Sequence, residues 1–530
     1  MDNINSYLGT IDFAVVGIYL IVLIAIGYWV SFVKKDDSGK DGNLFLAGRS
    51  LGWFSIGLTM WGTNVGPSML IASASIGYTT GVVAGNFSWY AFVFILLLAM
   101  IFAPRYLKAD VQTLPEFMGK RFGDSTRNIL AWYTLATILI SWLALTLFAG
   151  GILVSQILDV PLFVSILILI VIAAFFTIAG GLKAIAYTNA FQMILLILVS
   201  AILAIVGVVK AGGPAAILEA TPDHYWNLFQ PADDPNYPWI ALLLGYPIMG
   251  VWFWCTDQSM VQSVLGAKSL RQGQLGANFT GWLKILDVFL FIIPGITCFV
   301  LFPNLSNPDE AYMTMVTRLL PSGMIGLVMA VLIAALVSTI DSALNSLSTV
   351  FTMDIYVKNI NPKASQKQII NVGRAVTVIG GVLTIFIALG IDSIKGLNLF
   401  DVFQAVLGFL APPLSVVFLF GVLWKKTTTK AANITLVLGT IISLGTGILY
   451  LFVFPNDKYD FWPHFLLLSF YIFMFLSVLA FVVSYFDKVN TEENSLDYGV
   501  MPKAEGLVRN AWIALVVVMI GLYFIFNVVL

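Results

Sequence analysis

Long apolar runs separated by short polar connections are the main pattern along this chain. A helix needs about 20 apolar residues to cross a bilayer, and the sequence offers about fourteen such runs. They cover approximately residues 11–33, 51–80, 84–107, 128–156, 161–180, 183–209, 238–262, 274–303, 322–350, 369–395, 397–424, 431–454, 461–486 and 508–529. The pattern predicts an all-α polytopic membrane protein without a sizeable soluble domain.

Composition agrees with this class and argues against others. Of 530 residues, 59% are hydrophobic and 10% are charged, whereas about a quarter of a soluble chain is charged. The net charge of −1 gives no sign of a nucleic-acid partner. Cys255 and Cys298 lie in apolar runs and indicate neither a disulfide framework nor a metal site. His224 and His464 have no clustered nucleophile or metal ligand, so we do not expect an enzyme.

Lysine and arginine are distributed unevenly between the two sets of connections. The connections that follow odd-numbered runs, with the basic residues at their edges, hold 22 of the 27 basic residues. The opposite side has Lys210, Arg318, Lys395 and Lys458, and Lys284 lies inside a run. Because cytoplasmic connections carry the excess of positive charge, both termini are predicted to lie outside. No basic segment precedes the first run, so we expect a retained span rather than a cleaved signal peptide.

Polar side chains gather on one face of a single apolar run. Ser338, Asp341, Ser342 and Asn345 recur at three- and four-residue spacing, and Thr339 lies beside them. A single membrane serine usually bonds back to its own helix, but hydrocarbon offers a whole polar face no partner. Hydroxyl and carboxylate oxygens are ligands that hard cations such as sodium favour. We therefore predict that this face contacts an ion, water or another helix.

The run at 51–80 is interrupted at residues 63–67 by the letters TNVGP. This segment could be a proline kink that neighbouring helices and water accommodate. Alternatively, the helix is unwound here and its freed carbonyl groups coordinate a cation, as in the discontinuous helices of secondary transporters. A broken helix beside a hydroxyl-bearing helix is the arrangement that a dehydrated sodium ion requires.

Other polar residues within apolar runs each admit two interpretations. Lys284 either pairs with Asp287 on its own helix or donates hydrogen bonds to a polar solute. Asp401 and Gln404 either cap a helix at the interface or face one cavity. Asn189, taken by itself, is typical of a hydrogen bond between helices.

Several segments resemble the sodium:solute symporter family, and within it the sodium/glucose (galactose) cotransporter branch. They appear in family order between about residues 40 and 425 and read LFLAGRSLGWFSIG, TLPEFMGKRFG, FTIAGGLKAIAYTNAFQ, WFWCTDQSMVQ, STIDSALNS, FTMDIY, LFDVFQ and FLAPPL. The resemblance implies a ten-helix core of two five-helix inverted repeats, the leucine-transporter-like fold, at residues 44–425. It also implies an accessory first helix at 1–35 and three accessory helices at 426–530.

The resemblance further implies a coupling ion, Na+, and its ligands. Carried over by position, the main sodium site consists of the backbone oxygens of Gly62, Val65 and Ala335 and the hydroxyls of Ser338 and Thr339. All five residues are compatible with that role, including a threonine where a second serine is usual.

A second sodium site is implied less directly. Some family members hold a second ion with an aspartate at the position of Asn189 and hydroxyls at those of Asp341 and Ser342. In this chain the carboxylate is found at position 341 instead of position 189. We hypothesise that Asp341 supplies the charge and Asn189 a neutral oxygen. The alternative is a single-sodium carrier in which Asp341 bonds to neighbouring helices.

Six positions form the implied solute site, and only half of them match the sugar carriers. The matching polar residues are Asn64, Lys284 and Gln404. The others differ: Ser88 replaces a glutamate, Met69 an amide or imidazole, and Gly250 a polar residue. Each lost contact can cost roughly 1–3 kcal/mol, so glucose or galactose is not assumed.

The implied gates are aromatic. Phe253 takes the place of the inner-gate tyrosine, and Phe87 and Phe400 fall at outer-gate positions. The resemblance therefore implies sodium-coupled symport of a sugar or sugar-like solute by alternating access, and the small connections suggest the inner membrane of a bacterium. Alternative solutes are an amino sugar, a polyol, sialic acid or another carboxylate, which Lys284 would attract. A channel is a further alternative, but the candidate sites converge on one mid-membrane region.

Overall fold

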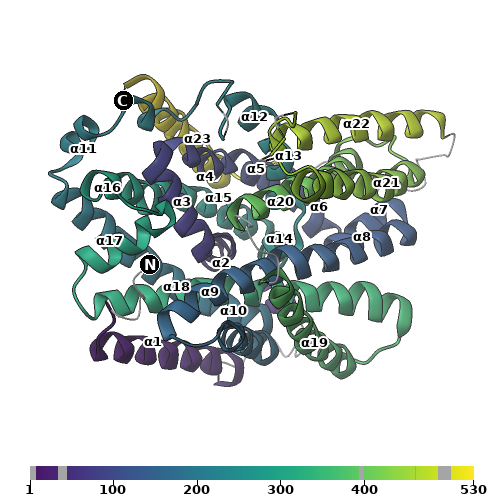
Figure 1. Cartoon of the computed structure of the whole chain (residues 1–530). Helices are drawn as coiled ribbons and strands as arrows, with labels where there is room; N and C mark the ends of the chain where they lie inside the picture. Colours follow the sequence, from purple (N-terminus) through teal and green to yellow (C-terminus); the bar gives the residue numbers. More distant parts are fainter. Residues whose placement is uncertain are drawn as a thin grey trace.

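The computed structural model shows a bundle of long helices that run roughly side by side (Figure 1). It describes residues 7–33, 44–234, 236–392, 399–456, 458–459, 461–487 and 503–529. The side chains of residues 67–68, 392 and 399–403 are not described. Within the described residues every regular segment is helical, apart from two isolated bridges between single residues. The predicted all-α class is therefore confirmed.

The first half of the chain forms α1 (Thr10–Tyr28), α2 (Trp53–Asn64), α3 (Pro67–Thr80), α4 (Gly85–Trp89), α5 (Ala91–Leu97), α6 (Ala103–Lys108), α7 (Leu114–Phe122), α8 (Asp124–Thr137), α9 (Leu145–Leu158), α10 (Leu162–Lys210) and α11 (Pro214–Ala220). The second half forms α12 (Trp239–Leu244), α13 (Tyr246–Val251), α14 (Gln258–Leu265), α15 (Leu270–Asp287), α16 (Ile293–Leu301), α17 (Ala311–Leu319), α18 (Met324–Val350), α19 (Gln366–Asp392), α20 (Leu399–Leu423), α21 (Thr429–Ile448), α22 (Phe465–Phe486) and α23 (Gly506–Phe524). Short π-helical or 3-10 segments extend several helices, among them η8 (Trp252–Thr256) and η11 (Phe351–Ile360).

Twelve helices among the described residues are long and apolar enough to cross a membrane, against the roughly fourteen runs counted at 20 residues each. The difference arises where two predicted runs are joined into one continuous helical segment. The runs at 51–80 and 84–107 are joined as Met69–Lys108, and those at 161–180 and 183–209 as Leu162–Lys210. Every predicted run therefore has a helical counterpart.

The long helix α10 reverses direction at Gly181. A straight helix of 49 residues would be about 74 Å long, well over the ~30 Å of hydrocarbon in a bilayer. Gly181 has φ 54° and ψ −150°, a conformation open essentially only to glycine. The N–H of Leu182 donates to the Leu44 carbonyl at 3.0 Å. A one-residue turn therefore joins two crossings without a polar loop.

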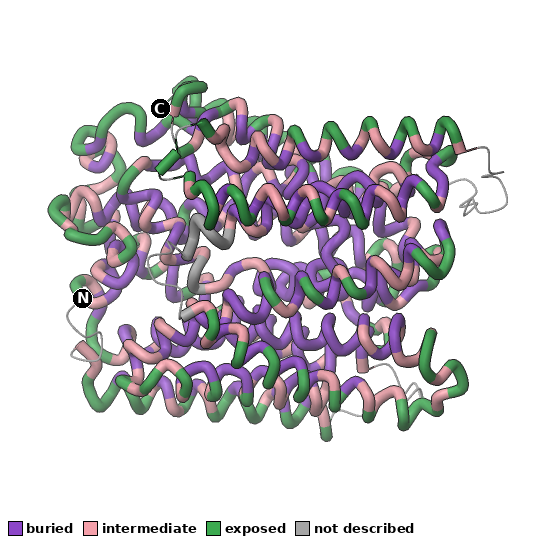
Figure 2. The backbone as a smooth tube through the Cα atoms, turned by 45° about the vertical axis from the view of Figure 1, so that its right-hand side comes forward, coloured by how far each residue is buried: buried purple, intermediate pink, exposed green. Residues whose placement is uncertain are grey.

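The helix α18 lies at the centre of the bundle. In its most apolar window, which belongs to the segment Met324–Ile360, 89% of the residues are buried. The corresponding share is 28% for α1, α19, α21 and α22 and 22% for α23. Figure 2 shows the same gradient, with buried residues inside and exposed ones on the outer helices. Because α19 lies within the predicted core and is as little buried as α1, α21 and α22, burial does not test the division at 44–425, which stays a prediction.

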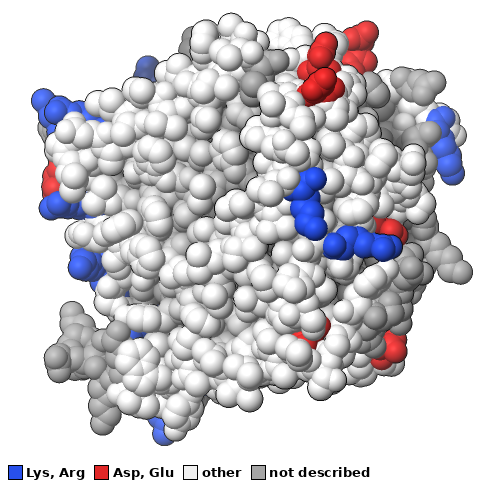
Figure 3. Space-filling model, turned by 90° about the vertical axis from the view of Figure 1, so that its left-hand side faces the viewer, with Lys and Arg blue, Asp and Glu red and all other residues white. Residues whose placement is uncertain are grey.

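The starts of α1 and α18 are tied together by Asp12. Its buried carboxylate accepts hydrogen bonds from the N–H groups of Gly323 and Gly326, both at 2.7 Å, and from the Ser322 hydroxyl at 3.0 Å. A carboxylate here satisfies amides that have no partner within the helix. Both chain ends are marked on this side of the bundle (Figure 1), and the charge pattern assigns this side to the outside. Figure 3 views it and shows isolated charges on a largely uncharged surface.

We expect Gly181→Ala to destabilise the protein by about 2 kcal/mol or more, because such a backbone conformation costs a non-glycine residue roughly 1–3 kcal/mol. The added Cβ would also lie 2.0 Å from the Leu44 carbonyl oxygen. Thermal unfolding in detergent would show a lower midpoint. Gly445→Ala is the matched control, because nothing lies within 4 Å of a Cβ added there. Equal midpoints for the two variants would contradict the turn at Gly181.

Candidate ion and solute sites

The helix that begins as α2 is broken before Pro67. Val65 (φ −87°, ψ 85°) and Gly66 (φ −93°, ψ 163°) leave the helical conformation, and α3 starts at Pro67. Pro67 has no N–H to donate to the Thr63 carbonyl, and the N–H of Gly66 donates to the residue two positions before it, at 3.1 Å. The carbonyl groups of Gly62 and Thr63 thereby lose their helical partners. The predicted broken helix is confirmed, and a simple kink is excluded.

The helix α18 presents two hydroxyl groups to this break. A Cβ atom on Gly62 would lie 3.1 Å from Ser338 Oγ, and one on Gly66 would lie 3.6 Å from Thr339 Oγ1. Thr339 Oγ1 is also 3.3 Å from the carbonyl oxygen of Thr63. The hydroxyl of Ser338 is fully buried and has no hydrogen-bond partner among the described residues. Because buried polar atoms are nearly always paired, this hydroxyl points to a ligand at the break.

The residues predicted for the main sodium site meet at this contact. Gly62 and Val65 belong to the break, and Ser338 and Thr339 face it from α18. The carbonyl of Ala335 lies 3.2 Å from Thr339 Oγ1, on the same face of the helix. The set offers neutral carbonyl and hydroxyl oxygens, which suit a hard monovalent cation. Their role as ion ligands remains a prediction.

A second group of buried polar side chains adjoins the first. Thr63 Oγ1 lies 3.0 Å from Ser342 Oγ, which donates to Asp341 Oδ1 at 3.3 Å. The other carboxylate oxygen of Asp341 has no partner among the described residues. The same holds for both amide atoms of Asn189 and of Gln192, and all three side chains are fully buried. The residues predicted for a second sodium ion are thus buried and polar, and Asn189 and Asp341 each have at least one polar atom without a partner among the described residues.

Sequence reasoning missed Gln192. It lies three residues after Asn189, on the same face of the second half of α10. The neighbouring Met193 packs against the helix break, since its Cγ would lie 2.8 Å from a Cβ atom on Gly62. The three-residue spacing of two amides in a membrane helix was the available signal.

A cavity of about 650 Å³ extends from the helix break toward the outer end of the bundle. Its lining includes Asp309, which precedes α17, and the rings of Trp142, Phe253 and Trp254. All six predicted solute residues line it, as do two of the three predicted gates: Asn64, Met69, Ser88, Gly250, Lys284, Gln404, Phe87 and Phe253. The side chain of the third gate, Phe400, lies outside the described residues.

Close packing between α2 and α15 shapes one wall of this cavity. A Cβ atom on Gly57 would lie 3.0 Å from the carbonyl oxygen of Gly276, so small residues let the two backbones approach. Trp61 and Asn64 follow Gly57 by four and seven residues, which places them on the same helical face. Both side chains therefore reach α15.

Lys284 and Asp287 of α15 are the centre of a buried polar network. The ammonium group of Lys284 pairs with Asp287 Oδ2 and donates to Asn64 Oδ1 at 2.8 Å. Asp287 Oδ1 accepts from Trp61 Nε1 at 2.8 Å, and its Oδ2 accepts from the Ser88 hydroxyl at 2.9 Å. The pair on its own helix is thus confirmed, and Lys284 also lines the cavity, whereas its role as a donor to a solute stays a prediction.

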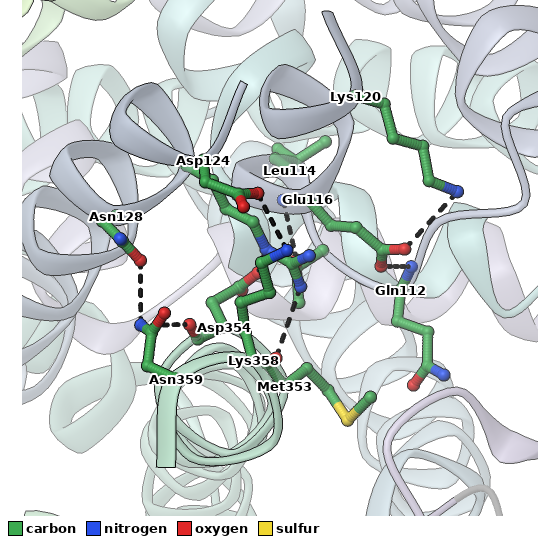
Figure 4. Close-up of polar contacts among 12 residues, drawn as sticks. Gln112, Leu114, Glu116, Lys120, Asp124, Asn128, Met353, Asp354, Lys358 and Asn359 are labelled. Atoms are coloured by element: carbon green, nitrogen blue, oxygen red, sulfur yellow. Dashed lines mark hydrogen bonds and ion pairs between the residues drawn. The ribbon is translucent and has the colours of Figure 1, made fainter. Parts of the chain in front are cut away.

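Polar contacts link α8 to η11 (Figure 4). Arg127 of α8 pairs with Asp354 of η11 at 2.7 Å and donates to the Met353 carbonyl at 3.3 Å. Lys358, further along η11, pairs with Asp124 at 2.9 Å. These residues belong to the basic connections that the charge pattern assigns to the cytoplasmic side.

Comparison with known proteins places this geometry in a family. The sequence model of the sodium:solute symporter family matches residues 44–439, more than half of the chain. Sodium/glucose cotransporter 4 of Danio rerio is 32% identical over 509 residues, covering 89% of this chain and 77% of its own. Sodium/myo-inositol cotransporter 2 of Bos taurus is 32% identical over 529 residues, covering 91% and 77%.

Solved structures show the same fold. A Na+-coupled sialic acid symporter in a substrate-bound, outward-open state gives a TM-score of 0.76 at 19% identity, covering 90% of this chain and 98% of its own. A nucleobase-cation-symport-1 family transporter in a closed conformation gives a TM-score of 0.51 at 14% identity, covering 82% of this chain and 99% of its own. The leucine-transporter-like fold predicted above is thereby confirmed. The chain belongs to the sodium:solute symporter family, and is a multi-pass membrane protein that transports a solute together with sodium rather than an enzyme.

Proposed function

We propose that this symporter carries a sugar or sugar-like solute by alternating access around a site in the middle of the membrane. One observation carries the proposal: the helix break belongs to both sites. Thr63, Asn64 and Thr339 line the solute cavity, while the Thr63 carbonyl and the Thr339 hydroxyl face each other at the ion contact. An ion and a solute bound here would stabilise the same backbone arrangement, which is what coupling requires.

The proposed class of solute is supported by the solutes for which the relatives are named and by the residues that line the cavity. The relatives are named for glucose and myo-inositol, and the structural neighbour for sialic acid. Asn64, Lys284 and Gln404 offer polar groups to such a molecule. Gly250 offers none, and a Cβ atom there would lie 2.4 Å from the ring of Phe94. Because Phe94 fills this space, the solute would make fewer polar contacts on this side than glucose does in the sugar carriers.

We also propose a bacterial cytoplasmic membrane as the location of the protein. Its described connections between crossings are short, and even the longer one between α10 and α12 holds only α11 and a single 3-10 turn.

In this proposal the main sodium ion is held by the oxygens of Gly62, Val65, Ala335, Ser338 and Thr339. The Ser338 hydroxyl fits this role because a cation would supply the partner that it lacks. Sodium bound there would brace the break against α18 and favour the outward-open state. Each charge that moves down about 100 mV contributes roughly 2.3 kcal/mol, enough for about 50-fold accumulation of solute.

Uptake into proteoliposomes tests the proposal, with a labelled panel of glucose, galactose, amino sugars, inositol and sialic acid. We expect an inward sodium gradient to drive accumulation of one neutral or amino sugar or of inositol. Ser338→Ala should lower the sodium affinity by about tenfold or more, because it removes an ion ligand whose loss costs 1–3 kcal/mol.

Ser348→Ala is the matched control for this variant. Ser348 is buried on the same helix, but its hydroxyl already donates to the Gly373 carbonyl at 2.7 Å, away from the break. Its sodium dependence should stay that of the wild type. Sodium-independent equilibration in the wild type, or an unchanged sodium affinity in Ser338→Ala, would contradict the proposal.

A second sodium ion would bind between Asp341, Ser342 and Asn189. Asp341 carries a carboxylate into the membrane interior, where an uncompensated charge is costly, and one of its oxygens lacks a partner. The unpartnered amide of Asn189 supports a cation between α10 and α18, and that of Gln192 adds a further oxygen. The alternative is a protonated Asp341 in a single-sodium carrier.

The sodium dependence of uptake distinguishes these two cases. With two ions, the wild type should have a Hill coefficient near two and Asp341→Asn one near one, since the amide removes the compensating charge. The double variant Asn189→Asp, Asp341→Ser, which returns the charge to the other wall, should recover the wild-type value. A coefficient near one in wild type and Asp341→Asn alike would exclude the second ion.

A further inference from the structure

Asp287 lies directly behind the wall of the solute cavity. Its side chain is 1% exposed and is not part of the lining, whereas its partners Lys284 and Ser88 are. Trp61 donates to one carboxylate oxygen, and Lys284 and Ser88 both donate to the other. Because the carboxylate lies behind its three donors and does not line the cavity, it acts on the cavity through those neighbours.

The charge of Lys284 is therefore compensated before a solute arrives. Among the described lining residues the charged ones are Lys284 and Asp309, and Asp309 is an exposed residue of the connection before α17. An anionic solute next to Lys284 would place a second negative charge, besides that of Asp287, beside the single positive charge of the lysine. In a region of low dielectric this excess negative charge is costly. A cation would meet the ammonium group itself. Only an uncharged solute avoids both penalties.

The remaining hydrogen-bonding groups favour a solute with many oxygens. An ammonium group has three N–H donors, and those of Lys284 reach Asp287 and Asn64, with one left over. The carbonyl oxygen of Asn64 is occupied by Lys284, so its amide nitrogen is the group left to contact the solute. Both offer donors to hydroxyl oxygens.

We propose that Asp287 is a positioning residue that sets the charge preference of the cavity, so that the solute is an uncharged sugar or polyol rather than an anionic or amino sugar. This inference rests on the proposed function and narrows it. Ser88, where the sugar carriers have a glutamate, donates to Asp287. A carboxylate thus still compensates the lysine, but it comes from α15, the helix that carries Lys284.

The test compares matched neutral and anionic solutes. The assay measures uptake, by the full-length protein under a sodium gradient, of the labelled sugar or polyol that the wild type accumulates. Unlabelled competitors are added in two matched pairs: glucose and glucuronate, and galactose and galacturonate. In Asp287→Asn, the ratio of the inhibition constant of the neutral sugar to that of the uronate should rise by about tenfold or more. The reason is that Lys284, one partner of a buried charge pair, is left uncompensated. Ser88→Glu in the same background returns a carboxylate from α4 and should restore the wild-type ratio.

Each other outcome counts against the proposal. Asp287→Asn could instead lower the affinity for the neutral sugar and for the uronate equally, without rescue by Ser88→Glu. This result would show that Asp287 only supports the fold. Preferential sodium-driven uptake of labelled glucuronate, sialic acid or glucosamine by the wild type would overturn the charge preference while sodium coupling stands, and this result depends on no variant. If no sugar or polyol is taken up with sodium, the proposed function itself fails.

Discussion

A helix that stops inside a membrane must find partners for its backbone, and this requirement governs the structure around the break before Pro67. Hydrocarbon supplies no hydrogen bonds, so released carbonyl groups have to face protein, water or an ion. Here α18 meets them with hydroxyl groups, one of which approaches the carbonyl of Thr63. The central position of α18, with 89% of its apolar window buried, follows from this contact, because both partners must be shielded from lipid.

The two faces of α2 connect the proposed ion site to the proposed solute site. One face, through Gly62 and Thr63, meets the hydroxyls of α18. The other, through Trp61 and Asn64, meets the charged pair of α15. A change in the ion contact must therefore move the same helical turn that holds one wall of the cavity. The contacts between α8 and η11 join two further helical segments at the end that the charge pattern assigns to the cytoplasm (Figure 4).

Much of this arrangement could be predicted from the sequence, because a membrane imposes strong patterns. Apolar length revealed the crossings, and glycine followed by proline inside a run revealed the break. The turn at Gly181 falls in the gap between the predicted runs 161–180 and 183–209, but the absence of a polar loop there did not show how tight the turn is. Family resemblance, rather than spacing, pointed to the six solute residues, and all six of them line the same cavity in the structure.

What the sequence could not show are partners far apart along the chain. The three-residue spacing of Lys284 and Asp287 suggested their pair, but Trp61 and Ser88 reach Asp287 from 226 and 199 residues away. The loss of a polar group at Gly250 likewise looked arbitrary until Phe94 was seen to occupy the space. Such contacts depend on how helices pack, which hydropathy does not encode.

Hydrogen–deuterium exchange of the full-length protein in sodium chloride and in choline chloride tests the central claim most directly. If sodium links the helix break to α18, it should slow exchange in peptides that cover residues 60–70 and 332–342, and the effect should be lost in Ser338→Ala. Exchange in both segments that is the same in sodium and in choline, in a protein that still takes up solute with sodium, would contradict the account.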